Sequence, residues 1–391
     1  MEPAAQIEST SRAMAIRRLT LTDFRNHARA RLEDITSQMV VLTGPNGAGK
    51  TNVLEALSLL APGRGLRRAA FADMARLPRA AQWAIAAQAE GLRGPARIGM
   101  QWRAGEGREP ASRRIRIDER NARGAGELAA HVRVSWLTPA NDGVFVAAAA
   151  DRRRLIDSLA LAMDPEHAAR LSAMEKLLRQ RNRLLPEWRA QGPWLDAIEA
   201  QLAEVSISVA ATRLMTVEAI NAAMPKLHGA GENLFPPARL AMSGWLEERL
   251  GHEPALAVED ACRARLRDTR ARDAEAGRTL SGAHRSDVEV VHVPRQMPAR
   301  LCSTGEQKAL LLSLTLAHVL AVREQLGGAA PLLLLDEVVA HLDSARRAGL
   351  FAILRQLGAQ VWMTGTDAAF FAEIAGHSQH FVVEEGNVQP A

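Results

Sequence analysis

The hydrophobic positions in the first third of the chain follow the spacing of β-strands. Apolar and polar side chains nearly alternate over residues 16–21, a pattern typical of a strand with one buried face. Residues 39–42 are apolar without interruption, as expected of a short strand buried on both faces. Further strands are expected at residues 96–102 and 113–117. The pattern therefore predicts a sheet-rich region that extends to about residue 150.

The middle of the chain has a helical period instead. From residue 151 to 227, apolar side chains recur three and four positions apart, as on the buried stripe of a helix. This rhythm is carried by Leu195, Ile198, Leu202, Val205 and Val209. Pro186, Gly192 and Pro193 interrupt it, so we expect a hairpin-like pair of helices rather than one long arm. Another helical segment is expected over residues 253–272.

Strands and helices alternate again after residue 288. The two flanking regions together predict an α/β fold that is interrupted by a helical insert. We expect four segments: a flexible extension (1–13), a first lobe (14–150), an inserted helical lobe (151–281) and a returning lobe (282–391).

The composition is that of an ordinary globular protein and does not indicate a particular function. Of 391 residues, 47% are hydrophobic, which is normal for a globular protein. The apolar runs are of strand length, shorter than the roughly 20 residues of a membrane-spanning helix. The N-terminus is polar and lacks the apolar core of a signal peptide, and the two cysteines, Cys262 and Cys302, have no metal-binding spacing. We therefore expect a cytoplasmic protein.

The formal net charge of +5 allows a polyanionic partner but does not require one. Nearly all basic residues are arginines, and the lysines are Lys50, Lys176, Lys226 and Lys308. Together with abundant alanine and the absence of tyrosine, this preference for arginine indicates a biased genome composition. Such a bias explains the positive charge as well as a polyanionic partner would.

A phosphate-binding loop follows the apolar strand at residues 39–42. Its residues match the G-x-x-x-x-G-K-[ST] pattern at every fixed position. They are Gly44, Pro45, Asn46, Gly47, Ala48, Gly49, Lys50 and Thr51. The glycines let backbone N–H groups face the phosphates at the start of a helix predicted over residues 52–60. Lys50 is expected to reach the β- and γ-phosphates of ATP, and Thr51 to ligate Mg²⁺.

A second chemical element lies far downstream. The apolar run 331–335 ends in Asp336 and Glu337, and paired carboxylates at the end of a buried strand are costly without a cation. Asp336 fits a ligand of Mg²⁺, held through water, and Glu337 fits the general base that orients the attacking water.

A third element opens the helix predicted over residues 309–322. Ser303 and Glu306 have the spacing of a helix-capping box, an ordinary structural feature. In this order along the chain, however, the segment around Ser303 and Gly305 resembles the signature motif of ABC ATPases, which contacts ATP on the opposite subunit. Asp343 lies in a segment that resembles their D-loop. No histidine occupies the place of their switch residue after the strand expected at 360–364, and Thr364 or Thr366 is expected to substitute.

These motifs imply an ABC-type ATPase head, a P-loop NTPase fold similar to SMC heads, with an inserted helical lobe. A transporter ATPase would carry its signature roughly a hundred residues after the phosphate loop, whereas some two hundred and fifty intervene here. The insert is also too short for the coiled coil of an SMC protein.

Further segments resemble the RecF family, and the resemblance covers almost the whole chain from Ala15. They are residues 19–26 (LTLTDFRN), 52–56, 63–67 (GRGLR), 116–118, 137–139, 180–185 (QRNRLL) and 282–287 (GAHRSD), with Arg153, Arg154 and Asp157. The spacing of Asn141, Asp142 and Gly143 departs from the family pattern, so no role is transferred there.

The RecF resemblance implies a weak, DNA-stimulated ATPase that acts as a switch with ATP and Mg²⁺. It also implies an ATP-bound homodimer, binding to gapped DNA and single-strand/double-strand junctions, and cooperation with RecO and RecR in loading recombinase. Roles in DNA repair, recombination, replication and the SOS response follow from it. Arg64 and Arg67 either face DNA phosphates or form an ordinary solvated face. The alternative functions are an ATPase subunit of a transport system and a small-molecule kinase, which would need no signature helix.

Overall fold

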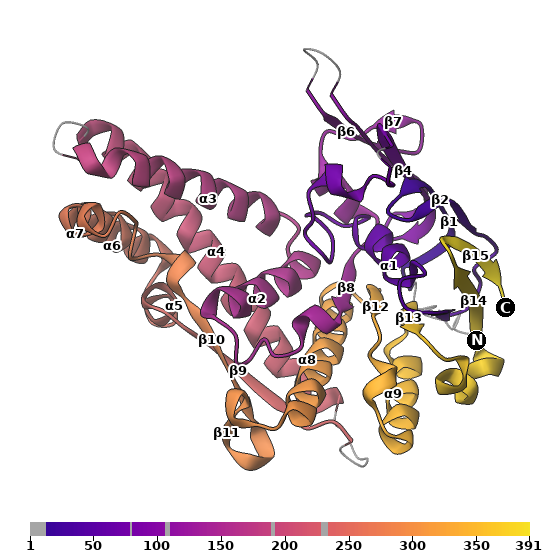
Figure 1. Cartoon of the computed structure of the whole chain (residues 1–391). Coiled ribbons are helices and arrows are strands. Elements are labelled where there is room, and N and C mark those ends of the chain that lie inside the picture. The colour runs from indigo at the N-terminus through magenta and orange to yellow at the C-terminus, as the bar shows by residue number, and fades with distance from the viewer. Residues whose placement is uncertain (1–12, 79, 106–109, 189–191, 228–233) are drawn as a thin grey trace, which may run out of the picture. The chain divides into compact units, whose positions relative to one another are not determined.

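The computed structural model of the chain describes residues 13–78, 80–105, 110–188, 192–227 and 234–391. The predicted N-terminal extension, apart from Ala13, lies outside the described residues. The chain forms two compact units (Figure 1). We call residues up to 139 together with those from 319 onward the sheet unit, and residues 140–318 the helical unit.

One sheet of the sheet unit has the strand order β15-β14-β3-β13-β12-β8. Its strands are parallel except β15, which pairs antiparallel with β14. The strands are β3 (Met39–Thr43), β8 (Val134–Leu137), β12 (Leu332–Leu335), β13 (Val361–Gly365), β14 (Ser378–Glu384) and β15 (Asn387–Pro390). Every residue of β3, β12 and β13 is buried, which explains their unbroken apolar runs. The strands predicted at 39–42, 331–335 and 360–364 are confirmed.

The second sheet of this unit is antiparallel, with the order β2-β1-β4-β5-β6-β7. Its strands are β1 (Ala15–Phe24), β2 (His27–Leu32), β4 (Gln82–Gly91), β5 (Gly94–Arg103), β6 (Ser112–Ile117) and β7 (Arg120–Asn121). Side chains alternate between buried and exposed along β4 and β5, so only one face packs into the core. The strands predicted at 16–21, 96–102 and 113–117 are confirmed.

Helix α1 (Lys50–Ser58) joins the two sheets into one core. Its Val53, Leu54 and Leu57 share a buried cluster with Leu21 of β1 and Leu42 of β3. This packing fixes the start of α1 at the carboxyl end of β3. The unit also contains α9 (Ser344–Leu357).

The helical unit is built on long helices with a small sheet of order β11-β10-β9. Its elements are α2 (Ala149–Met163), α3 (His167–Leu184), α4 (Gly192–Leu227), β9 (Ala238–Ser243), α5 (Trp245–Leu250), α6 (Ala255–Asp268), α7 (Arg270–Glu275), β10 (Asp287–His292) and β11 (Met297–Pro298). Helices α3 and α4 are the predicted hairpin-like pair. Helix α8 (Thr304–Gln325) contains the boundary between the units. None of the described helices is long and apolar enough to cross a membrane.

Short 3-10 helices lie in the connections. They span Phe71–Met74, Ala125–Ala130, Pro139–Asn141, Leu185–Glu187, Ala283–Arg285, Val293–Arg295, Ala299–Leu301, Val339–His341 and Ala368–His377.

The two units divide at residues 139/140 and 318/319 rather than at the expected boundaries 150/151 and 281/282. The second boundary lies further along the chain than expected because β10 pairs with β9 along its whole length, from Asp287↔Ser243 to His292↔Ala238. Residues 282–318 therefore pack with the helical unit, and the segment around Ser303 belongs to it.

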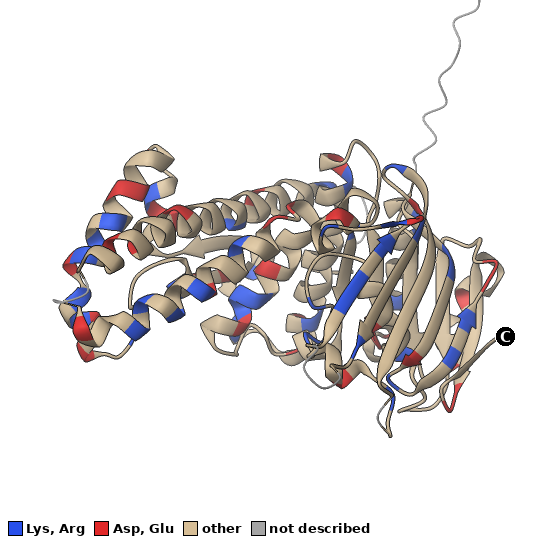
Figure 2. Cartoon of the chain, turned by 90° about the horizontal axis from the view of Figure 1, so that it is seen from above, with Lys and Arg blue, Asp and Glu red and all other residues tan. Residues whose placement is uncertain are grey.

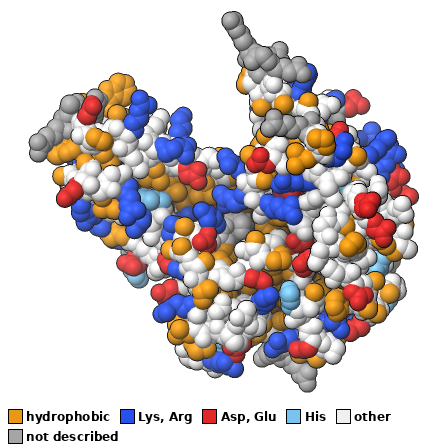
Figure 3. Space-filling model, in the orientation of Figure 1, with side chains coloured by type: hydrophobic (Ala, Val, Ile, Leu, Met, Phe, Trp, Pro, Cys, Tyr) orange, Lys and Arg blue, Asp and Glu red, His pale blue; other side chains and the backbone are white. Residues whose placement is uncertain are grey.

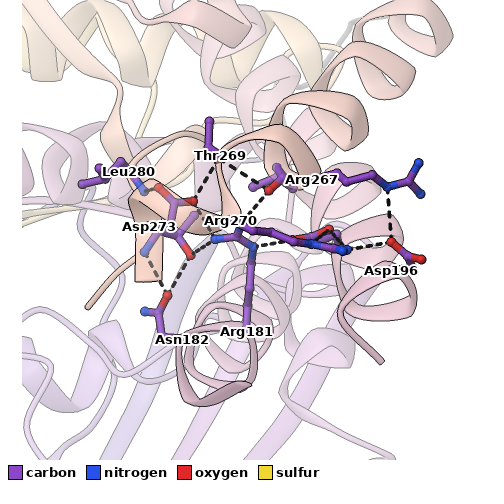
Figure 4. Close-up of polar contacts among 11 residues, drawn as sticks. Arg181, Asn182, Asp196, Arg267, Thr269, Arg270, Asp273 and Leu280 are labelled. Atoms are coloured by element: carbon purple, nitrogen blue, oxygen red, sulfur yellow. Dashed lines mark hydrogen bonds and ion pairs between the residues drawn. The ribbon is translucent and has the colours of Figure 1, made fainter. Parts of the chain in front are cut away.

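A buried ionic network ties the helices of this unit together (Figure 4). Arg181 of α3 is fully buried and donates to Glu199 Oε1 (2.9 Å), Asp273 Oδ2 (2.8 Å), the hydroxyl of Thr279 (2.8 Å) and Leu266 O (2.6 Å). A buried guanidinium is tolerated only when its donors are satisfied in this way. Arg181 lies in the segment 180–185 that carried part of the family resemblance, and its role in the fold is structural.

Candidate nucleotide site

The phosphate-binding loop, residues 44–49, connects β3 to α1 in the sheet unit. Glycine is required at both of its ends. Gly44 has a φ of 147°, and a Cβ there would lie 2.1 Å from the carbonyl oxygen of Val383. Gly49 has a φ of 117°, and a Cβ there would lie 2.6 Å from Asn26 Oδ1. No side chain caps the N-terminus of α1, so its first N–H groups are available to an anion.

Lys50 is the first residue of α1, directly after this loop. The residue is 4% exposed, and its ammonium donates to Gly44 O (2.7 Å) and Pro45 O (2.9 Å). Burial lowers the pKa of Lys50, an effect that the nearby Glu337 and Asp336 oppose. The fold thus holds a cation at the loop by surrounding it with backbone carbonyls and acidic groups.

Asp336 joins the end of β12 to the loop and to β13. Its carboxylate accepts from the hydroxyl of Thr51 at 2.9 and 3.1 Å and from the hydroxyl of Thr364 at 2.8 Å. A hydroxyl and a carboxylate at contact distance are oxygen ligands of the kind that Mg²⁺ prefers. The donor set present therefore fits a magnesium ion held between Thr51 and Asp336.

Glu337 has a backbone conformation that is uncommon outside glycine, with a φ of 53°. Its N–H donates to the hydroxyl of Thr364 (2.9 Å), which in turn donates to Asp336. Thr364 thus contacts the carboxylate of Asp336 and the backbone of Glu337, whereas Thr366 is exposed beyond the end of β13. Of the two threonines expected as substitutes for the switch histidine, Thr364 lies within the acidic site.

Two residues that contact the loop were assigned no role from the sequence. Asn26 donates to Ala48 O (2.8 Å) and accepts from the amide of Asn52 (2.6 Å). His27 is fully buried, with its ring nitrogens 2.6 Å from Gly386 O and 3.1 Å from Gly49 O. Asn26 lies in the turn after β1 and His27 begins β2, and His27 connects the loop to the turn between β14 and β15.

Arg67, one of the two arginines considered for DNA contact, is engaged within the chain. It donates to Asn52 Oδ1 (2.6 Å) and to the buried Glu55 (3.1 Å), which Arg25 also binds (2.6 Å). Arg64 is exposed.

The signature segment, residues 302–308, lies in the helical unit at the start of α8. Ser303 and Glu306 form a capping box, in which the N–H and the hydroxyl of Ser303 both donate to Glu306 Oε2 at 2.9 Å. Ser303 and Gly305 are exposed, and a Cβ at Gly305 would meet no atom within 4 Å. Lys308 pairs with Asp142 (2.8 Å), in the segment whose spacing departs from the family pattern.

Asp343 lies at the start of a helix of the sheet unit, as Ser303 does in the helical unit. It is the N-cap of α9, where its carboxylate accepts from the N–H of Arg346 at 2.8 Å, and its side chain is 61% exposed.

Comparison with known proteins shows the family to which this chain belongs. Residues 15–389 match the model of the RecF/RecN/SMC N terminal domain. A relative from Mesorhizobium japonicum named "DNA replication and repair protein RecF" is 48% identical over 375 residues, which cover 96% of this chain and 97% of the relative. The chain belongs to the RecF family. A RecF of the same name from Brucella abortus is also 48% identical, over 99% of both chains.

The solved structures that resemble this chain support the fold. RecF-ATP, described as a recombination mediator protein in the RecFOR pathway, has a TM-score of 0.83 and 21% identity over 98% of this chain and 99% of its own. An Smc head domain from Pyrococcus furiosus has a TM-score of 0.52 and 15% identity over 97% of this chain and 96% of its own. The fold is that of an ABC-type ATPase head, as expected, and the RecF relatives give no support to a transport function.

Proposed function

We propose that this protein is an ATP-dependent DNA-binding protein of replication and recombinational repair, in which slow ATP hydrolysis limits the lifetime of a grip on DNA. The observation that carries the proposal is the cluster of Thr51, Asp336, Glu337 and Thr364 beside the phosphate-binding loop. Membership of the RecF family, whose relatives are named replication and repair proteins, supplies the biological setting.

Each residue of the cluster has a role in this proposal. ATP with Mg²⁺ supplies the transferable γ-phosphoryl group when bound. The backbone N–H groups of residues 44–49 and the Lys50 ammonium neutralise phosphate charge. Thr51 and Asp336 hold the metal, Thr364 orients Asp336, and Glu337 accepts a proton from the attacking water.

A second copy of the chain completes the site. Ser303 and Gly305 are exposed at the start of α8, and Asp343 is exposed at the start of α9, so all three are accessible to a partner. We propose that they contact ATP held by the other chain. ATP then joins two chains into a dimer, and hydrolysis releases them.

The remaining parts of the proposal follow from the family. They are a preference for gapped DNA and single-strand/double-strand junctions, stimulation of a weak ATPase by DNA, cooperation with RecO and RecR, participation in the SOS response, and a cytoplasmic location.

DNA binding with and without ATP tests this function. Affinity for gapped duplex should require ATP, change little when the sequence is scrambled, and fall with salt at a log–log slope of about −0.9 per neutralised phosphate. Binding that is indifferent to ATP, or restricted to one duplex sequence, would contradict the proposal.

A further inference from the structure

The exposed face of the antiparallel sheet carries an ordered set of arginines. Leu19, Leu21 and Ile85 point into the core, so the residues between them on β1 and β4 point outward. On β2, β5 and β6 as well, the residues on the side of the sheet away from the core are exposed. We call the outward residues of these five strands the arginine face.

The strand register aligns the outward residues in rows across the sheet, and two of these rows begin and end with an arginine. One row runs across the sheet through Arg31, Thr20, Ala86, Gly99 and Arg116. The next row runs through Arg29, Thr22, Ala84, Gln101 and Arg114. Between the arginines the side chains are small or uncharged, so the centre of the face is low and neutral. Figure 2 shows basic positions on the strands at both sides of the sheet, with largely uncharged strands between them.

The charge of these arginines is not neutralised by nearby acids. Arg29, Arg31 and Arg114 have no ion-pair partner among the described residues, and Arg116 donates only to the backbone oxygen of Glu119 (3.3 Å). By contrast, Arg17 is paired with Glu90 at 2.6 Å. Acidic and basic side chains are also interspersed on the face of the molecule that Figure 3 shows. An unpaired excess of arginine on one face of a sheet is complementary to a polyanion.

The shape of the face favours a duplex over a single strand. Trp83 and Trp102 of β4 and β5 are on the buried side of the sheet, so neither offers a platform on this face for unstacked bases. Four strand spacings separate the arginines at the ends of a row, which is about 19 Å at the usual distance between strands. That separation exceeds the roughly 12 Å width of the DNA major groove, so the two ends can reach phosphates on both strands.

We propose that the arginine face grips the duplex part of DNA through its phosphates. This inference rests on the proposed function and names the surface that performs the binding. Contacts to phosphate position the duplex without reading its sequence, which agrees with a protein that acts at gaps wherever they occur.

A fourfold variant tests the surface. Replacing Arg29, Arg31, Arg114 and Arg116 by Gln should reduce the salt slope of duplex binding by about one for each phosphate that is no longer neutralised, and thus by up to about four. ATP binding and ATP-dependent dimerisation should not change. The control replaces four exposed arginines elsewhere by Gln, namely Arg239, Arg272, Arg278 and Arg355, and should keep the wild-type slope.

The outcomes separate the surface from the function. If wild type binds duplex with ATP but the fourfold variant keeps its slope, or the control variant is weakened as much, the arginine face is wrong and the proposed function stands. If wild type does not bind DNA at all, both fail. A defect confined to single-stranded oligonucleotide would overturn the assignment to duplex.

A single substitution avoids any effect of four changes on folding. Ala86 is exposed at the centre of one row, so Ala86→Glu places a negative charge where the duplex would lie. We expect weaker duplex binding for Ala86→Glu and near wild-type binding for Ala86→Gln. Equal binding by these two variants would overturn the proposal even if the fourfold variant could not be purified.

Discussion

In the sheet unit Lys50 and Asp336 are buried and bonded within their own chain, whereas in the helical unit Ser303 and Gly305 lie exposed at the start of α8. The first region uses its fold to hold polar groups in fixed positions: Thr364 contacts both acids, and Asn26 and His27 contact the loop. The second region needs only a capping box. This difference is consistent with our proposal that one half of the nucleotide site is complete in a single chain, while the other half is presented to a partner.

The largest effect should come from the loop itself. We expect Lys50→Ala to abolish tight ATP binding, because it removes a cation whose hydrogen bonds to phosphate are worth about 1.5–3 kcal/mol each. Titration calorimetry would measure the change in affinity. Lys176→Ala, an exposed lysine of α3, is the matched control and should bind ATP as wild type does. Equal affinity in the two variants would remove Lys50 from the site.

A smaller effect is expected from the threonine that orients the acids. Thr364→Val keeps the shape but removes the hydroxyl that contacts Asp336 and Glu337. Partners of metal ligands typically contribute about 10- to 100-fold, so ATP turnover should fall by that factor while nucleotide binding measured without Mg²⁺ persists. Thr366→Val, at an exposed position, should turn over ATP normally. If both valine variants behave alike, Thr364 is not an orienting residue.

The smallest effect concerns the capping box. Ser303→Ala removes the N-cap hydroxyl of α8 and should lower the free energy of unfolding by about 1 kcal/mol. Ser303→Thr keeps a hydroxyl and should be close to wild type in chemical denaturation. ATP binding to a single chain should be unchanged in both, and a loss of that binding would show that the two regions are not separable as we describe.

Local patterns in the sequence predicted the chemical centre of the molecule. The phosphate-binding loop and the pair Asp336 and Glu337 are each defined by a strand and the residues that directly follow it, so motif and structure coincide. The capping box was equally visible because Ser303 and Glu306 lie three residues apart.

Contacts between distant segments could not be predicted in this way. His27 reaches Gly386 across the chain, and nothing near either residue indicates the pairing. The pairing of β9 with β10 moves the unit boundary, and it depends on two strands separated by α5, α6 and α7. Arg67 was considered for DNA contact from its charge, and its ion pair with Glu55, on the buried side of α1, could not be predicted without the fold.

The composite site is the central claim, and sedimentation of two variants with ATP tests it most directly. Glu337→Gln keeps the size of the side chain but removes the general base, which typically contributes about 10²- to 10⁴-fold in rate. ATP should therefore bind and the dimer should accumulate. Ser303→Arg places a bulky cation at the exposed surface that, in our proposal, meets the partner's γ-phosphate, so each chain should bind ATP but remain a monomer. Dimers for Glu337→Gln and monomers for Ser303→Arg are the predicted result. If both variants stay monomeric, or both dimerise as wild type does, two chains do not share the site.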